Sequence, residues 1–161
     1  GKGTFVIRYP RGRGVLADWH CPLEEVEVGT GRKLRDGKDI AILSIGAVGN
    51  NAAKAVESME QDGAAVSCAH YDMRFVKPLD ENLLREVAGK FNKIITLEDG
   101  SREGGFGSAV LEWMDDNGYH PDIVRLGLPD RFVEQGTVAE LQHITGIDAE
   151  GIRRAIENMT K

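Results

Sequence analysis

Three arginines lie close together near the start of the chain. Arg8, Arg11 and Arg13 fall within six positions, with Pro10 and Gly12 between them. A guanidinium group presents a planar fork of N–H donors that matches the oxygens of a phosphate group. The cluster therefore predicts a site for a small phosphorylated molecule. The alternative is a set of solvated arginines in a connecting segment, which would contribute little energy.

A second set of charged residues lies in the glycine-rich segment 98–107. Glu98, Asp99 and Glu103 supply three carboxylates, and Arg102 lies among them, at the expected end of a strand. Two carboxylates can perform acid–base chemistry when burial separates their pKa values. An adjacent arginine would instead keep them ionised. We therefore expect these residues to tie the loop to its helix, or to a partner subunit, rather than to catalyse a reaction.

The remaining polar patterns are less informative. The turn Gly46–Gly49 leads from a strand into a helix, whose first amides could hold an anion, but it lacks the third glycine of a dinucleotide-binding motif. Close packing of helix on strand is the alternative. His20 and Cys21 could form a thiolate pair, although a surface loop is the simpler interpretation. We expect no metal site, since no ligand spacing links the histidines His20, His70, His120 and His143.

Composition limits the class of protein. The chain has 161 residues, of which 41% are hydrophobic and 29% charged, as in one water-soluble domain. Its formal net charge of -6 disfavours nucleic acid and anionic membranes as partners. Two cysteines and the lack of an apolar segment of about 18 residues suggest a cytoplasmic protein. The chain does not begin with methionine, so we expect a fragment of a longer protein.

Hydrophobic periodicity predicts alternating strands and helices. The apolar run 40–45 indicates a central strand covered on both faces, and Asp36-Gly37 before it predicts a hairpin turn. The expected fold is a three-layer α/β/α sandwich, with about five strands in a mostly parallel sheet and one antiparallel strand. We expect strands at 5–7, 26–34, 40–45, 65–69, 93–97 and 123–126, and helices from Asn50 or Asn51 and over 83–91, 106–114, 137–146 and 148–159.

Four ordered motifs together carry a family resemblance. The chain closely resembles the carboxy-terminal portion of the 1-deoxy-D-xylulose-5-phosphate synthase family. More distantly, it is similar to the last domain of transketolases and of the β subunits of 2-oxoacid dehydrogenases. The motifs are Arg8–Gly12, Asp72–Asp80, Gly104–Ser108, and Gly127–Asp130 followed by Gln135-Gly136.

The resemblance implies an enzyme that condenses pyruvate with D-glyceraldehyde 3-phosphate, releases CO2, and uses thiamine diphosphate and Mg²⁺. Its product serves isoprenoid, thiamine and pyridoxal synthesis. In the family the cofactor lies between two earlier domains, so none is expected on this chain, which should be inactive alone. Arg11 aligns with the arginine that holds the substrate phosphate, and Arg8 is a second candidate.

The resemblance also implies a division of the chain. Residues 1–14 correspond to the last strand and exit loop of a preceding pyrimidine-binding domain, 15–25 to a linker, and 26–161 to a transketolase C-terminal-like domain. Its partners would be the preceding domains and a second subunit of a homodimer. Two alternatives are an assembly domain of another transketolase-like or 2-oxoacid dehydrogenase enzyme, and a regulatory nucleotide-binding domain at the Gly46 turn.

Overall fold

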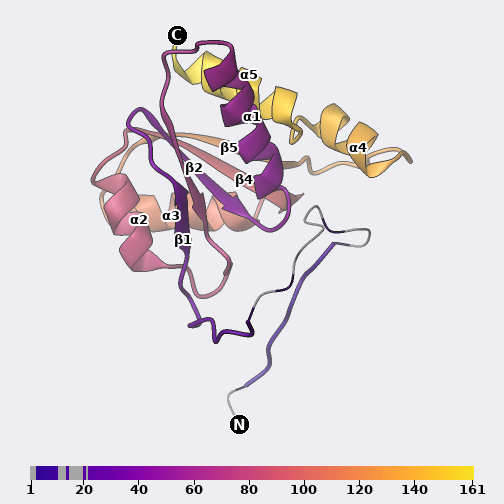
Figure 1. Ribbon diagram of the computed structural model, residues 1–161. Helices are drawn as coiled ribbons and strands as arrows, with labels where there is room; N and C mark the ends of the chain where they lie inside the picture. The colour runs from indigo at the N-terminus through magenta and orange to yellow at the C-terminus, as the bar shows by residue number, and fades with distance from the viewer. Residues whose placement is uncertain (1–2, 11–13, 15–19, 21) are drawn as a thin grey trace.

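The structure is a computed structural model that describes residues 3–10, 14, 20 and 22–161 (Figure 1). Within these residues, five strands form one sheet in the order β1-β3-β2-β4-β5. β1 is antiparallel to β3, and the other neighbouring pairs are parallel. This confirms the expected fold class. The strands are β1 Arg32–Arg35, β2 Ile40–Ile45, β3 Cys68–Asp72, β4 Lys93–Ser101 and β5 Asp122–Leu128.

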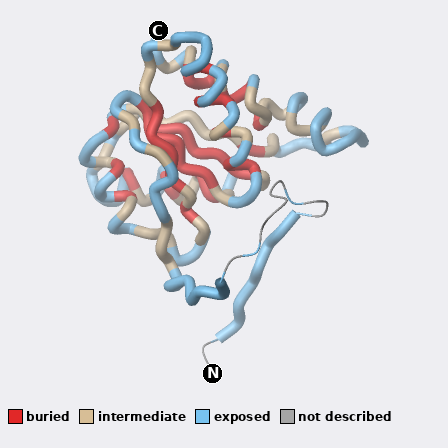
Figure 2. Tube along the Cα trace, viewed as in Figure 1, coloured by how far each residue is buried: buried red, intermediate tan, exposed pale blue. Residues whose placement is uncertain are grey.

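Helices cover both faces of the sheet. Ile40 and Ile42 of β2 point into a core formed with α1 and α5, whereas Ala41 and Leu43 point into a core formed with α2 and α3. All four side chains are fully buried, which explains why β2 is apolar at every position except Ser44 and lies red at the centre of Figure 2. The helices are α1 Gly49–Gln61, α2 Glu81–Ala88, α3 Phe106–Asp116, α4 Val138–Thr145 and α5 Ala149–Met159.

Local capping signals set the ends of the last two helices. Thr137 and Glu140 form the predicted capping box at the start of α4, and Gly146 ends that helix in the left-handed conformation, with φ of 73°. Asp148 caps α5 by accepting a hydrogen bond from the Gly151 amide at 2.8 Å. Among the described residues, no helix combines the length and hydropathy of a membrane span.

The predicted asparagine cap of α1 is wrong. The helix begins at Gly49 after Val48, and no side chain caps it. Asn50 instead donates its side-chain amide to the Ala47 carbonyl at 3.0 Å. The Asn51 amide donates to the carbonyl of Ile147, at 3.0 Å, so it ties α1 to the start of α5.

The predicted hairpin at Asp36-Gly37 is also wrong. β1 pairs with β3 rather than with β2, which follows it in sequence. Gly37 is needed for close approach: a Cβ atom there would lie 2.1 Å from the backbone nitrogen of Ala69. The amides of Lys38 and Asp39 donate to the Ser67 carbonyl at 3.2 and 2.9 Å. The glycine therefore lets the chain cross beside β3.

Strand limits differ from the predictions at four places. The strand expected over 26–34 begins only at Arg32, and it ends at Arg35. Residues 3–10 form no strand, because no neighbouring strand in the described part of the chain offers them hydrogen bonds. β3 begins at Cys68 rather than at Ala65, and β4 continues past Leu97 to Ser101. The added residues of β4 include Glu98 and Asp99, so part of the expected loop site belongs to a strand.

Candidate functional site

Three segments meet at the carboxyl edge of the sheet, where α/β proteins commonly bind ligands. They are 46–48 after β2, 102–105 after β4 and 129–137 after β5, and these strands are parallel. The amino-terminal segment touches the same edge. Nη2 of Arg8 lies 3.9 Å from Oδ2 of Asp99, with 71% and 46% of the two side chains exposed. Arg11 and Arg13 lie outside the described residues.

Glu98 is the buried member of the predicted carboxylate group. Glu98 is only 6% exposed. Its two carboxylate oxygens accept hydrogen bonds from the backbone amides of Phe106 and Gly107, each at 2.9 Å. These amides belong to the first turn of α3, which has no intrahelical partners for them. A carboxylate of the chain itself therefore occupies the anion-binding end of α3 and ties that helix to β4.

The other two carboxylates do not join Glu98. Nη2 of Arg102 lies 2.7 Å from Oε1 of Glu103, and this hydrogen bond is the main cause that lowers the pKa of Glu103. Asp99 faces Arg8 instead. Each carboxylate thus has a separate partner, and the segment does not form the closely spaced pair that acid–base catalysis would need.

Arg125 on β5 is a site residue that sequence reasoning missed. Its Nη1 donates to the Arg102 carbonyl at 2.9 Å and to Oγ of Ser108 at 2.7 Å, which fixes the loop between β4 and α3. Gly107 makes room for it, since a Cβ atom there would lie 3.2 Å from Cγ of Arg125 and 2.5 Å from Oγ1 of Thr96. In the sequence, only the glycine at position 107, inside the predicted helix 106–114, could have indicated that another side chain packs against the helix there.

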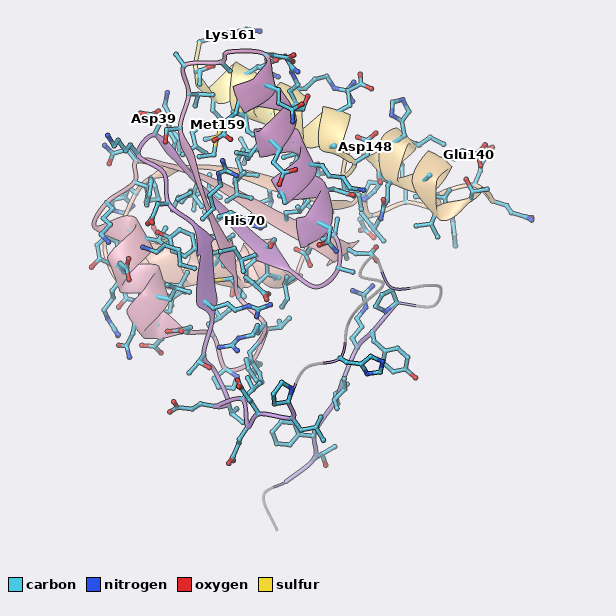
Figure 3. The ribbon with its side chains drawn as sticks, viewed as in Figure 1. Asp39, His70, Glu140, Asp148, Met159 and Lys161 are labelled. Atoms are coloured by element: carbon cyan, nitrogen blue, oxygen red, sulfur yellow. The ribbon has the colours of Figure 1, made fainter. Side chains whose placement is uncertain are left out.

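The Gly46–Gly49 turn is explained by packing. Oγ of Ser44 lies 2.8 Å from Nε2 of His70, and both residues are buried beneath the start of α1. A Cβ atom on Gly49 would lie 2.6 Å from Oγ of Ser44. The glycine therefore lets α1 begin directly over this polar pair, which favours the packing interpretation over a nucleotide site. Figure 3 shows His70 in the interior of the fold.

His70 makes stability depend on pH. The pKa of His70 is lowered, mainly because the side chain is buried. His70 therefore binds a proton less readily in the folded chain than in the unfolded chain, where its pKa has the usual value of about 6.5. The stabilisation that comes from the neutral His70 side chain is fully present above pH 6.5. It is lost as the pH falls toward the lowered pKa of the folded state. We expect the free energy of unfolding to fall by up to about 1.4 kcal/mol per pH unit in that interval.

Urea unfolding of the wild type and of His70→Gln between pH 7.5 and 5 measures this effect. Glutamine keeps a hydrogen-bonding group near Ser44 but does not titrate, so its profile should be flatter. The exposed residue His120, which lies 3.8 Å from Asp115, supplies the control His120→Gln. If the free energy of unfolding changed equally with pH in the wild type and in His70→Gln, the stability lost at low pH would come from other groups.

The motif Asp72–Asp80 fixes the segment that leads into β1. Arg74 adopts a φ of 54°, unusual for a residue with a side chain. Its guanidinium donates to the carbonyls of Thr30 and Gly31 at 2.8 and 3.0 Å. Asp80 accepts from the Gly31 amide at 2.7 Å and from the Leu83 amide at 2.9 Å, so it also caps α2. The motif is therefore structural in this domain.

The described residues do not fit thiamine diphosphate and Mg²⁺. Glu98 fills the first turn of α3, where its charge would repel a diphosphate. The one group of three metal-ligating side chains in the described segments is His143, Asp148 and Glu150. His143 pairs with Asp148, which caps α5, and Glu150 pairs with Arg154, both at 2.7 Å. Helix ends and ion pairs thus account for that group.

Cys68 is not a nucleophile. Its side chain is buried on β3, and burial raises the pKa of the thiol to about 11. The thiolate, which is the reactive form, is therefore scarce at neutral pH. Cys21, the other half of the predicted His20-Cys21 pair, lies outside the described residues.

Comparison with known proteins places the chain in a family. The profile described as "Transketolase, C-terminal domain" matches residues 29–152, which include every strand and the start of α5. The chain belongs to the transketolase C-terminal domain family.

Relatives of this transketolase C-terminal domain confirm the resemblance seen in the four motifs. A 1-deoxy-D-xylulose-5-phosphate synthase of Bacteroides fragilis is 58% identical over 155 residues, which are 96% of this chain and 24% of that protein. The synthase of Cytophaga hutchinsonii is 53% identical over 159 residues, 99% of this chain and 25% of that protein. The chain thus spans about a quarter of the length of these relatives.

Two solved structures share the transketolase C-terminal fold. A structure described as a split gene transketolase, inactive beta4 tetramer, is 32% identical with a TM-score of 0.76, and the match covers 84% of this chain and 43% of that chain. A transketolase from Campylobacter jejuni is 13% identical with a TM-score of 0.59, covering 81% of this chain and 18% of that chain. At that identity the second match supports the fold alone.

Proposed function

We propose that this chain is the carboxy-terminal quarter of a 1-deoxy-D-xylulose-5-phosphate synthase. The complete enzyme would condense pyruvate with D-glyceraldehyde 3-phosphate and release CO2. Thiamine diphosphate and Mg²⁺ would bind to the preceding part of the polypeptide. The observation that carries the proposal is the 58% identity to such a synthase over 96% of the chain.

We further propose that the chain contains parts of two domains. Residues 1–14 would be the last strand and exit loop of a pyrimidine-binding domain, 15–25 a linker, and 26–161 the transketolase C-terminal-like domain. The exposure of Phe5, Val6 and Ile7, at 59%, 88% and 78%, supports this division. These side chains are typical of a strand, and a preceding domain would give them a sheet to join.

The role of this domain would be assembly rather than catalysis. Its described residues bring no pair of acid–base groups together at the carboxyl edge, and Glu98 and Arg125 serve to hold α3 and its loop. We propose that the domain braces the preceding domains within a cytoplasmic homodimer and is inactive when isolated.

The contribution of the chain to the active site would come from its arginines. We propose that Arg11 binds the phosphate of D-glyceraldehyde 3-phosphate and that Arg8 is a second phosphate ligand. Arg8 keeps 71% of its side chain exposed, and its contact with Asp99 is long at 3.9 Å. Its guanidinium can therefore turn toward a phosphate with little loss of ion-pair energy.

An assay of the complete protein tests this function. We expect it to release CO2 from pyruvate only when the aldose phosphate, thiamine diphosphate and Mg²⁺ are all present, and to form 1-deoxy-D-xylulose 5-phosphate. The isolated 161-residue chain should form none. A complete protein that forms no such product, or an isolated chain that does, would contradict the proposal.

A further inference from the structure

A single charged contact joins the start of the chain to the domain. Residues 3–10 form no strand, and Figure 1 shows them extending away from the three layers. Among the described residues, the contact between Arg8 and Asp99 is the one hydrogen bond or ion pair that links this segment to the rest of the fold. Asp99 is therefore the polar residue of the domain that acts directly on the guanidinium of Arg8.

The strand that carries Asp99 holds its carboxylate in place. Glu98, the residue before it, is buried and ties the strand to the first turn of α3. Two residues after Asp99, Ser101 pairs with Leu128 of β5, and the Arg102 amide donates to the Leu128 carbonyl at 2.8 Å. The Asp99 side chain is 46% exposed, so it projects toward Arg8 from backbone that is anchored before and after it.

Arg8 can bind a phosphate while it stays beside this carboxylate. Its Nη2 lies 3.9 Å from Oδ2 of Asp99, and 71% of the Arg8 side chain is exposed. A guanidinium has five N–H donors in a planar fork, so one edge can face Asp99 while another edge binds phosphate oxygens. An arginine loses rotamer entropy when it binds a ligand, and a neighbouring carboxylate that restricts the side chain beforehand lowers that loss.

We propose that Asp99 is a positioning residue for the substrate phosphate, and that it acts through Arg8. This inference rests on the proposed function, because it requires Arg8 to be a phosphate ligand of the complete synthase. In the proposed division of the chain, Arg8 follows the last strand of the preceding domain, which fixes its backbone. Asp99 restricts its guanidinium from across the domain boundary. The rival role is competition, in which Asp99 draws Arg8 away from the phosphate.

Steady-state kinetics of the complete protein test this role. Asp99→Asn keeps the size of the side chain and removes its charge. We expect KM for D-glyceraldehyde 3-phosphate to rise about two- to fivefold, as the loss of an exposed ion pair would predict, with kcat and KM for pyruvate unchanged. Asp99→Glu restores the charge and should recover most of the loss. Glu103→Gln, at an exposed carboxylate in the loop after β4, should leave both KM values unchanged.

A double-mutant cycle with Arg8 shows whether Asp99 acts through that arginine. In an Arg8→Ala background, Asp99→Asn should change KM for the aldose phosphate by less than about 1.5-fold, because the side chain that Asp99 positions is gone. The melting temperatures of the single and double variants should be close to that of the wild type, since an exposed pair contributes little to stability. A role in stability alone would not produce this pattern.

Three results would overturn the inference. An unchanged KM in Asp99→Asn would show that Arg8 needs no carboxylate beside it. A lower KM would show that Asp99 competes with the phosphate. An equal rise of KM with and without Arg8 would show that Asp99 acts independently of the arginine. Each of these results requires an active synthase, whereas a complete protein without synthase activity would contradict the proposed function on which the inference rests.

Discussion

We expect Glu98→Ala to lower the free energy of unfolding by about 2–4 kcal/mol. The substitution removes the carboxylate that accepts hydrogen bonds from the amides of Phe106 and Gly107. Both amides are buried where water cannot replace the carboxylate as their acceptor. A buried donor left without an acceptor costs about 1–3 kcal/mol. The loss should appear in urea unfolding of the 161-residue chain as a lower midpoint with an unchanged slope.

Two variants separate this effect from a general loss of charge. Glu98→Gln keeps one acceptor oxygen and should lose about half as much stability. Glu103→Ala removes an exposed carboxylate that pairs only with its neighbour Arg102 in the described structure, and should change stability by less than about 0.5 kcal/mol. If Glu98→Ala matched Glu103→Ala, the first turn of α3 would not depend on this carboxylate.

We expect Arg11→Ala in the complete protein to raise KM for D-glyceraldehyde 3-phosphate, a substrate of the proposed synthase, about tenfold or more. A charge-assisted arginine–phosphate contact contributes about 1.5–3 kcal/mol, which corresponds to at least a tenfold change in affinity. KM for pyruvate and the melting temperature should barely change, because pyruvate carries no phosphate. Initial rates with each substrate varied in turn measure the effect.

An arginine that is paired within α5 provides the control. Arg154 lies on α5, where it forms an exposed ion pair with Glu150. Arg154→Ala should leave both KM values unchanged, and Arg8→Ala should raise KM for the aldose phosphate by a smaller factor than Arg11→Ala. Unchanged kinetics of Arg11→Ala would remove Arg11 from the phosphate site.

Features set by near neighbours could be predicted from the sequence. The capping box at Thr137 and the cap at Asp148 involve residues three positions apart, so the pattern contains both partners. The apolar run 40–43 likewise predicted a strand that is buried on both faces, because burial determines the type of residue at each of these positions. The hairpin at Asp36-Gly37 could not be predicted correctly, because the choice between β2 and β3 as a partner of β1 depends on residues more than thirty positions away.

The candidate site was harder to predict than the fold. The charged residues at 98–103 could be identified from the sequence. The sequence alone did not indicate that Glu98 would be buried against α3 whereas Glu103 would be exposed to solvent. The roles of Arg74 and Arg125 depend on carbonyl groups distant in sequence, at Thr30 and Arg102. Such contacts follow from the packing of β1 and β5, which no local pattern specifies.

The central claim is that Arg11 belongs to the phosphate site of a synthase whose remaining parts precede this chain. The most direct test compares kcat/KM of the complete wild type and of Arg11→Ala with D-glyceraldehyde 3-phosphate and with D-glyceraldehyde. We predict a loss of about tenfold or more with the phosphorylated aldose and of less than about twofold with the unphosphorylated one. Equal losses with both substrates would contradict the claim.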